Sequence, residues 1–290
     1  MNSLKVKAPA KINLSLDIIG VLPNGYHSLC MIMQSVTLFD EITVTKKDSG
    51  GIVLTCDAEG IPLDKRNIIY KVAKKFFEHA DIAENVSFHL KKVIPSQAGL
   101  GGGSADGAAV LKALNKLYIT NFSDDKLCEI GVTVGADIPF CIKGGTALVG
   151  GIGEKITPLK PMPDCDIVIV KPKAGIDTAK AFADSDNCEL IKHPDTYAIL
   201  SAIDNEDLGT LSQNLCNVLE QVAGLSEIDE IKSKLLARGA IGALMTGSGS
   251  AVFGIFDNHS IAKDCCEVLS EEYKDTFLVQ PYRDLKEEIK

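Results

Sequence analysis

The sequence predicts an α+β protein with two domains. Strand-like alternation and helix-like spacing of apolar residues occur in both halves of the chain. The length of 290 residues corresponds to about two average domains. Three prolines, at 158, 161 and 163, form the strongest boundary signal. We therefore predict one domain at 1–160 and a second at 161–290.

Strands dominate the start of the first domain. Residues 11–18 alternate strictly between apolar and polar side chains, which predicts a half-buried strand. The turn residues at 23–25 lead into a second extended run at 27–39. Further short strands are expected at 42–44, 52–54, 86–90, 146–149 and 154–156.

Helical periodicity predicts helices at 68–77, from 104 to about 118, and from 124 to near the turn at 135–137. Asn67 and Ser123 are residue types that cap the N-termini of the first and third helices. A glycine-rich loop at 95–103 opens directly into the second helix.

The second domain is expected to open with a strand at 166–170. Helical patterns follow at 178–184, 195–203, 207–222 and 226–238. Gly239 lies where a C′ glycine ends the last of these helices. Residues 243–256 predict a glycine-interrupted hairpin, followed by a helix at 261–269 and a closing strand at 276–280.

Composition and charge exclude several classes of protein. Hydrophobic residues make up 46% of the chain and charged residues 24%, which is typical of a globular protein. The formal net charge of −9 argues against a nucleic-acid partner, since such binding needs clustered Lys and Arg. A phosphate-bearing small molecule stays possible, because a local site can bind it.

The cysteines and apolar stretches indicate a cytoplasmic protein without a membrane partner. The nine cysteines form no C-x-x-C, and free thiols suit a reducing compartment. The five histidines have no zinc spacing, so no metal-ligating residue is predicted. The uncharged stretches at 18–39 and 239–256 are broken by turn residues and glycines, and the N-terminus has no signal-peptide core. The sequence leaves the oligomeric state open.

The segment from Pro95 to Asp106 carries the strongest functional signal. Glycine lets backbone N–H groups converge on an anion, and the helix that follows adds its positive N-terminus. A tight strand-to-helix turn is the simpler alternative, but it does not need three glycines in a row at 101–103. The Walker A, dinucleotide and nucleophile-elbow patterns all fail here, so we predict a phosphate-binding loop of another kind.

This loop resembles the phosphate loop of the GHMP kinases. Residues 9–14 and 246–250 are similar to the N-terminal and C-terminal motifs of that superfamily, in the same order. Gly25-Tyr26-His27 and the run 135–139 narrow the resemblance to the branch that acts on a cytidine diphosphate-linked methylerythritol. The similarity extends from about residue 5 to 256.

The resemblance implies a fold, a reaction and the co-substrates. The N-terminal domain would be like domain 2 of ribosomal protein S5, the C-terminal domain would be ferredoxin-like, and the active site would lie between them. The reaction would be ATP-dependent phosphorylation of the 2-hydroxyl of the cytidine diphosphate-linked methylerythritol, on the non-mevalonate route to isoprenoid precursors. The enzyme would be a small-molecule kinase with an alcohol as acceptor, and Mg²⁺ is expected.

The catalytic residues implied by the resemblance are Asp137 and Lys11. Phosphoryl transfer to an alcohol needs a proton acceptor and cations near the moving group, and these residue types supply both. A turn aspartate and a solvated lysine are the simpler interpretations of the two positions. Asn13 lies on the same predicted strand face as Lys11, which fits an orienting role toward the substrate.

The resemblance also assigns binding residues. The nucleotide would contact Asn67, Lys92, Pro95, Ser96, Gln97, Ala98, Gly99, Leu100, Gly101, Gly102, Gly103, Ser104 and Ala105. The cytidine would contact Tyr26, His27, Thr178 and Phe182, with Phe182 stacked opposite Tyr26. Two positions depart from the family pattern: Ala105 replaces a second loop hydroxyl, and Arg66 replaces the usual aspartate before Asn67.

Three other functions compete with this one. Another GHMP enzyme, such as homoserine kinase or a mevalonate-pathway kinase, is disfavoured by Gly25-Tyr26-His27 and by the uninterrupted glycine run. A non-catalytic binding protein on the same fold is disfavoured because both Lys11 and Asp137 are present. A hydrolase lacks a nucleophile pattern in this sequence.

Overall fold

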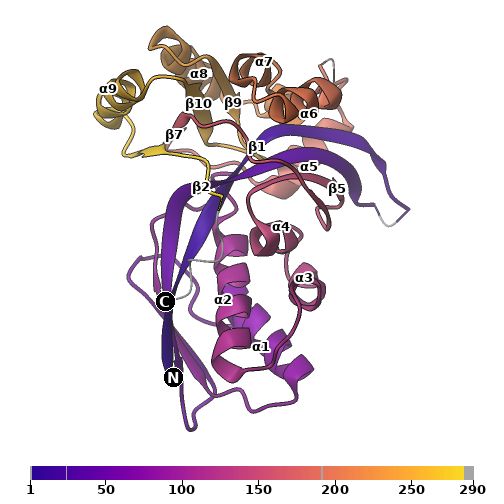
Figure 1. The fold of residues 1–290 in the computed structure, drawn as a ribbon, viewed down its shortest axis with the longest axis vertical. Helices are drawn as coiled ribbons and strands as arrows, with labels where there is room; N and C mark the ends of the chain where they lie inside the picture. The colour runs from indigo at the N-terminus through magenta and orange to yellow at the C-terminus, as the bar shows by residue number, and fades with distance from the viewer. Residues whose placement is uncertain (1, 24, 191, 284–290) are drawn as a thin grey trace.

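The computed structural model describes residues 2–23, 25–190 and 192–283, and these residues form two sheets with helices (Figure 1). The first sheet has the strand order β3-β4-β2-β1-β8, and β5 and β6 extend it from β2. Its strands are β1 (Ser3–Val21), β2 (His27–Lys46), β3 (Ile52–Cys56), β4 (Val86–Lys91), β5 (Thr146–Gly151), β6 (Lys155–Pro158) and β8 (Cys216–Asn217).

The long β1–β2 hairpin connects the two parts of the molecule. Its strands pair from Ser3 with Thr45 at one end to Val21 with His27 at the other. In Figure 1 the hairpin rises from the lower sheet to the level of the upper helices. One hairpin therefore carries residues from the first sheet into the neighbourhood of the second.

Four helices lie together on one side of the first sheet (Figure 1). They are α1 (Ile68–Ala80), α2 (Gly102–Tyr118), α3 (Asp124–Val132) and α4 (Ile138–Lys143). The predicted caps of α1 and α3 are confirmed: Asn67 accepts a hydrogen bond from the Ile69 amide, and Ser123 accepts one from the Lys126 amide. The helix α4 was not predicted, because six residues are too few to display a helical period.

The second sheet is antiparallel, with the strand order β11-β7-β10-β9. Its strands are β7 (Asp166–Lys171), β9 (Gly242–Met245), β10 (Val252–Phe256) and β11 (Asp275–Val279). The helices of this half are α5 (Thr178–Asp186), α6 (Thr196–Asp204), α7 (Leu208–Gln213), α8 (Ser226–Ala237) and α9 (His259–Ser270), with a 3₁₀ turn, η1 (Val218–Val222). The predicted hairpin at 243–256 is confirmed as β9 and β10.

A shared core joins the two sheets. Ile12 and Leu14 of β1 belong to the same buried cluster as Ile167 and Ile169 of β7. The strand predicted at 11–18 is confirmed as part of β1, but the prediction that it is half-buried is wrong, since residues 8–16 are all buried. Ile12 and Leu14 pack against β7 of the second sheet. Asn13 lies next to the loop that joins β9 to β10, where the Thr246 hydroxyl accepts a hydrogen bond from the Asn13 backbone amide.

Two further expectations need correction. The segments 27–39 and 42–44 form one continuous strand, β2, because Asp40 and Glu41 are accommodated within it. The helix predicted at 207–222 is divided into α7, β8 and η1. The division occurs at Asn217, whose side chain donates hydrogen bonds to the carbonyls of Met245 and Gly247 and accepts one from the Leu219 amide.

The predicted domain boundary at 160/161 stays a prediction. The chain leaves the first sheet after β6 and enters the second at β7. The short strand β8 then returns to pair in parallel with β1, and Pro281 bridges to Val36. Among the described residues, no helix is both long enough and apolar enough to cross a membrane.

Candidate active site

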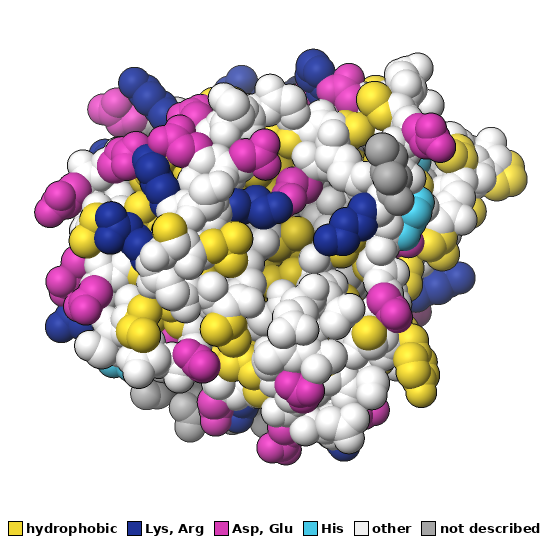
Figure 2. Space-filling view, turned by 90° about the horizontal axis from the view of Figure 1, so that it is seen from above, with side chains coloured by type: hydrophobic (Ala, Val, Ile, Leu, Met, Phe, Trp, Pro, Cys, Tyr) yellow, Lys and Arg dark blue, Asp and Glu magenta, His cyan; other side chains and the backbone are white. Residues whose placement is uncertain are grey.

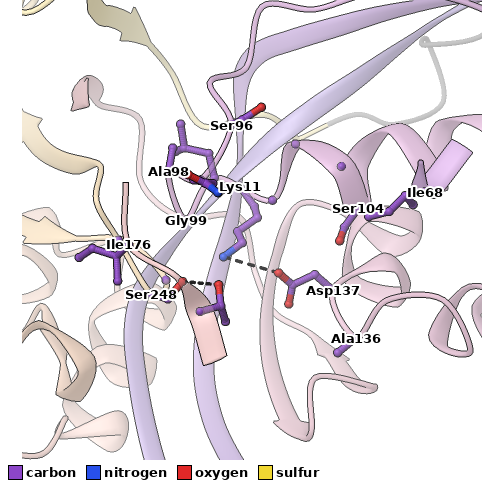
Figure 3. A pocket seen from close by; sticks show the side chains of 18 of the residues that line it. Lys11, Ile68, Ser96, Ala98, Gly99, Ser104, Ala136, Asp137, Ile176 and Ser248 are labelled. Atoms are coloured by element: carbon purple, nitrogen blue, oxygen red, sulfur yellow. Dashed lines mark hydrogen bonds and ion pairs between the residues drawn. The ribbon is translucent and has the colours of Figure 1, made fainter. Parts of the chain in front are cut away.

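A cavity of about 670 Å³ lies between the glycine loop and the loop that joins β9 to β10. Its walls also include residues of β1, the end of β4 and the start of α5. Figure 3 shows Lys11 of β1 between the glycine loop and Ser248 of the β9–β10 loop. The predicted site residues that line it are Lys11, Asn13, Asn67, Lys92, residues 95–104, Asp137, Thr178 and Phe182. Residues that are far apart in the sequence are thus brought to one cavity.

Glycine is required in the loop for backbone geometry and for space. Gly101 precedes α2 with φ +68°, and Gly99 has φ +73°, a region that favours glycine. A Cβ at position 99 would lie 2.0 Å from the carbonyl oxygen of Thr246. The Leu100 carbonyl accepts a hydrogen bond of 3.0 Å from the Lys11 amide, so the loop is held against β1 as well.

The N-terminus of α2 is suited to bind an anion. No side chain caps this helix at Gly101, so the first-turn amides are not used by a capping residue. These amides and the helix dipole give a partial positive charge beside the cavity. The loop and the helix start can therefore hold a phosphate group, as the sequence predicts.

Lys11 and Asp137 face each other across the cavity (Figure 3). The Lys11 ammonium lies 3.8 Å from Asp137 Oδ2 and donates a hydrogen bond of 2.7 Å to Asn13 Oδ1. Asp137 precedes α4 without a side-chain capping bond, so its carboxylate is not consumed by the helix. A carboxylate that is held near a buried cation and still accessible can accept a proton from a bound alcohol.

A second charged cluster lies at the other end of the glycine loop. Lys92 Nζ is 3.1 Å from Asp106 Oδ2 and contacts Asp40 Oδ2. Burial lowers the pKa of Lys92, but the carboxylates of Asp106 and Asp40 outweigh burial and raise it. Burial raises the pKa of Asp106, as does the nearby Asp40, although Lys92 opposes this shift. Asp106 Oδ1 is buried without a hydrogen-bond partner.

The second half of the chain contributes the opposite wall. Thr178 starts α5, and its hydroxyl is 2.8 Å from the Ser248 hydroxyl. Gly247 faces the glycine loop so closely that a Cβ there would lie 2.9 Å from the Gly99 carbonyl oxygen. The two glycine motifs singled out in the sequence are therefore in direct contact.

The residues predicted for the cytidine lie only partly at the cavity. Phe182 lines it, and His27 stacks on Phe182 with ring centroids 4.9 Å apart. The His27 ring covers Phe182 and Tyr26 is 61% exposed, and the placement of Phe182 opposite Tyr26 around a pyrimidine stays a prediction. His27 Nε2 also lies 2.7 Å from Asp186 Oδ1, which fixes the imidazole.

Ala105 lies away from the cavity surface, so its predicted contact with the nucleotide stays a prediction. Its side chain is 1% exposed within the hydrophobic core, so it does not line the cavity. Two polar residues were missed, Asp40 and Asn217, both of which are buried. An aspartate inside an otherwise apolar strand is the signal that could have revealed Asp40.

The fold and the site define a small-molecule kinase of the GHMP class. The model of the GHMP kinases N terminal domain matches residues 67–145, and that of the GHMP kinases C terminal domain matches 199–275. Homoserine kinase from Cytophaga hutchinsonii shares the fold, with a TM-score of 0.77 at 18% identity, covering 98% of this chain and 95% of that one. The predicted fold and enzyme class are therefore confirmed.

More similar relatives define the family. The 4-diphosphocytidyl-2-C-methyl-D-erythritol kinase of Clostridium novyi is 44% identical over 94% of this chain and 98% of its own length. That of Acetivibrio thermocellus is 45% identical over 97% and 99%. A crystal structure of 4-(cytidine 5'-diphospho)-2C-methyl-D-erythritol kinase has a TM-score of 0.81 at 30% identity, covering 96% and 99%. The chain belongs to the 4-diphosphocytidyl-2-C-methyl-D-erythritol kinase family.

Proposed function

We propose that this chain transfers the γ-phosphoryl group of ATP to the 2-hydroxyl of 4-diphosphocytidyl-2-C-methyl-D-erythritol. Family membership over nearly the whole chain supports the substrate. One structural observation carries the chemistry: Lys11 and Asp137 face each other in the same cavity as the glycine loop. A proton acceptor, a cation and a phosphate cradle are the parts that phosphoryl transfer to an alcohol needs.

In this proposal Asp137 acts as the general base. Its carboxylate accepts the proton of the acceptor hydroxyl as that oxygen bonds to the γ-phosphorus. The bond between the γ-phosphorus and the bridging oxygen breaks, and ADP leaves with that electron pair. Lys11 keeps the Asp137 carboxylate facing the cavity, and its positive charge stabilises the negative charge that develops on the transferring group.

The glycine loop binds the phosphates of ATP. The amides at the start of α2 face the anion, and Asn67 and Lys92 line the same cavity on the side assigned to adenine. The described residues contain no group of three or more His, Cys, Asp or Glu placed to hold a metal ion. Mg²⁺ commonly takes only one or two protein oxygens together with substrate phosphates.

The residues present fit such a partly open Mg²⁺ site. The Ser104 hydroxyl lines the cavity in the first turn of α2, on the same side as Asp137 (Figure 3). We propose Ser104 as the protein oxygen that holds the ion. Mg²⁺ bound with ATP would neutralise part of the phosphate charge. When no ion is bound, the Ser104 hydroxyl would donate a hydrogen bond to a phosphate oxygen.

The cytidine end of the substrate binds between the hairpin tip and α5. Phe182 and His27 supply aromatic faces, Tyr26 lies next to His27 in the chain, and Thr178 adds a hydroxyl at the cavity wall. Asn13, held by Lys11, orients the methylerythritol hydroxyls. The His27 ring covers Phe182, so we expect His27 to shift when the pyrimidine stacks there.

Location and partners follow from the same proposal. All nine cysteines are free thiols, which supports a reducing cytoplasm. Figure 2 shows acidic and basic side chains intermixed over the face seen from above, with no extended basic area on that face. A small molecule is therefore the partner that we propose, and neither a nucleic acid nor a membrane.

An assay with three acceptors tests the proposed function. ADP release is measured with ATP and 4-diphosphocytidyl-2-C-methyl-D-erythritol, and in parallel with homoserine and with mevalonate. We expect turnover with the cytidine-linked acceptor alone. Turnover with homoserine or mevalonate instead would leave the kinase class standing and reject the proposed substrate.

A further inference from the structure

Asp40 lies outside the cavity, yet it is bonded to the segment that leads into the glycine loop. Its side chain is fully buried within β2. Asp40 Oδ1 accepts hydrogen bonds from the amides of Val93 and Ile94, at 2.5 and 2.8 Å. Asp40 Oδ2 accepts a hydrogen bond from the Lys92 ammonium. One carboxylate therefore holds three consecutive residues between β4 and Pro95.

The position of Lys92 explains why this carboxylate matters. A Cβ at Gly102 would lie 3.0 Å from Lys92 Nζ, so the ammonium lies against the first residue of α2. A cation at a helix N-terminus is disfavoured by the helix dipole. The Asp40 carboxylate offsets this repulsion, and Asp106 Oδ2, 3.1 Å from Lys92 Nζ, accepts a second hydrogen bond that helps to hold Lys92 at the cavity wall.

We propose that Asp40 is a positioning residue for the nucleotide: it fixes Lys92 and the entry to the glycine loop in the arrangement that binds ATP. This inference rests on the proposed function of the cavity as the ATP site. Asp40 itself does not line the cavity. It acts through Lys92, which does, and through the backbone that precedes Pro95. Carboxylates form strong hydrogen bonds to both kinds of donor.

The variant Asp40→Asn separates the two kinds of contact. The amide oxygen of asparagine can still accept the bonds from Val93 and Ile94. Its NH₂ group then faces Lys92, so a donor meets a donor and Lys92 loses the charged partner that Asp40 supplies. We expect the KM for ATP to rise about tenfold or more. The KM for the cytidine-linked acceptor should stay within about twofold, because its proposed contacts lie elsewhere.

A buried carboxylate remote from the cavity provides the matched control. Asp166 in β7 is 7% exposed and accepts hydrogen bonds from Gln280 and His259. Asp166→Asn is expected to lower the melting temperature without changing the KM for ATP. If Asp40 had only a structural role, Asp40→Asn would behave in the same way, and that outcome would overturn the proposal.

A double variant tests whether Asp40 acts through Lys92. If it does, Lys92→Met and the combined Asp40→Asn/Lys92→Met protein should have the same KM for ATP, whereas additive effects would overturn this route. If Asp40→Asn does not fold, Asp40→Ser, which keeps a hydroxyl acceptor but places no charge opposite Lys92, is measured instead and is held to the same expected rise and the same rejection. If the wild-type enzyme does not use ATP at all, the proposed function is rejected. If the wild type is active and the Asp40 variant has an unchanged KM for ATP, only the positioning role of Asp40 is rejected.

Discussion

The Lys11 ammonium lies 3.8 Å from the Asp137 carboxylate, with the lysine side chain 5% exposed and the aspartate side chain 34% exposed. The cation is thus buried in β1, while the carboxylate that it faces stays open to the cavity. This asymmetry suits a general base, which must reach the substrate, and a cation, which need only remain close. It also excludes the interpretation of Lys11 as a solvated surface residue.

The first prediction concerns Asp137 as the base. Asp137→Asn keeps the shape of the side chain but removes its charge and its ability to accept the proton. We expect kcat to fall by about 10²-fold or more, with little change in either KM. Steady-state kinetics with ATP and the cytidine-linked acceptor provide the measurement.

Asp125→Asn is the matched control for that substitution. Asp125 pairs with Lys143 at 2.7 Å, and its side chain is 85% exposed. An exposed ion pair contributes little to stability, so this variant should have the kcat of the wild type. Near-normal turnover by folded Asp137→Asn protein would reject Asp137 as the base.

Local sequence signals predicted much of the fold and of the nucleotide loop. The caps Asn67 and Ser123 and the helix that follows the glycine run depend on neighbours in the chain, and each is found where the sequence indicates. Lys11 and Asp137 were named by resemblance, and the structure brings them together at one cavity. Their distance and difference in exposure could not be read from spacing.

Features that depend on distant contacts were missed. Asp40 looks like a polar interruption of a strand, and its role depends on Lys92, Val93 and Ile94 more than fifty positions away. Ile12 and Leu14 are buried with residues of β7, and Asn13 is covered by the loop that contains Thr246, which no alternation within β1 can reveal. The segment 207–222 has helical spacing, yet the tertiary bonds of Asn217 interrupt it.

The second prediction concerns Gly99. Gly99→Ala is disfavoured for two reasons. The φ of Gly99 is +73°, and a Cβ at this position would lie 2.0 Å from the Thr246 carbonyl oxygen. The loop must therefore move away from the β9–β10 loop. A displacement of about 1 Å at a catalytic site can cost about 10²-fold in rate, and we expect kcat/KM for ATP to fall by about that factor.

Gly224→Ala separates backbone strain from the steric clash. Gly224 has a φ of +61°, but the nearest atom to its Cβ position is 3.9 Å away. An alanine there should cost about 1–2 kcal/mol of stability and leave the kinetics unchanged. Equal losses of activity in the two variants would show that close packing at Gly99 is not the cause.

The third prediction concerns recognition of the cytidine. Phe182→Ala removes an aromatic face that now stacks on His27. By analogy with stacking of single-stranded bases, which contributes about 1–3 kcal/mol per base, we expect the KM for the cytidine-linked acceptor to rise about 5- to 150-fold. The KM for ATP should be unchanged in the same assay.

Tyr197→Ala is the control for loss of an aromatic ring. Tyr197 lies in α6, is 81% exposed and does not line the cavity, so both KM values should match the wild type. A rise in the KM for ATP with Phe182→Ala, and none for the acceptor, would move Phe182 to the nucleotide end and contradict the proposed cytidine site.

The last prediction links Asp106 to pH. Burial raises the pKa of Asp106 to about 8, so the folded protein keeps this proton more tightly than the unfolded chain, where the pKa is about 3.9. The stability gained is complete below the unfolded value and is lost as pH rises to about 8. The free energy of unfolding of Asp106→Asn should therefore rise by at least about 1 kcal/mol relative to that of the wild type between about pH 5 and pH 8 in urea titrations.

Asp207→Asn is the control. Hydrogen bonds from Thr210 lower the pKa of Asp207, so the free energy of unfolding of Asp207→Asn should differ from that of the wild type by a constant amount over this range. A constant difference for Asp106→Asn as well would show that Asp106 does not carry the proton.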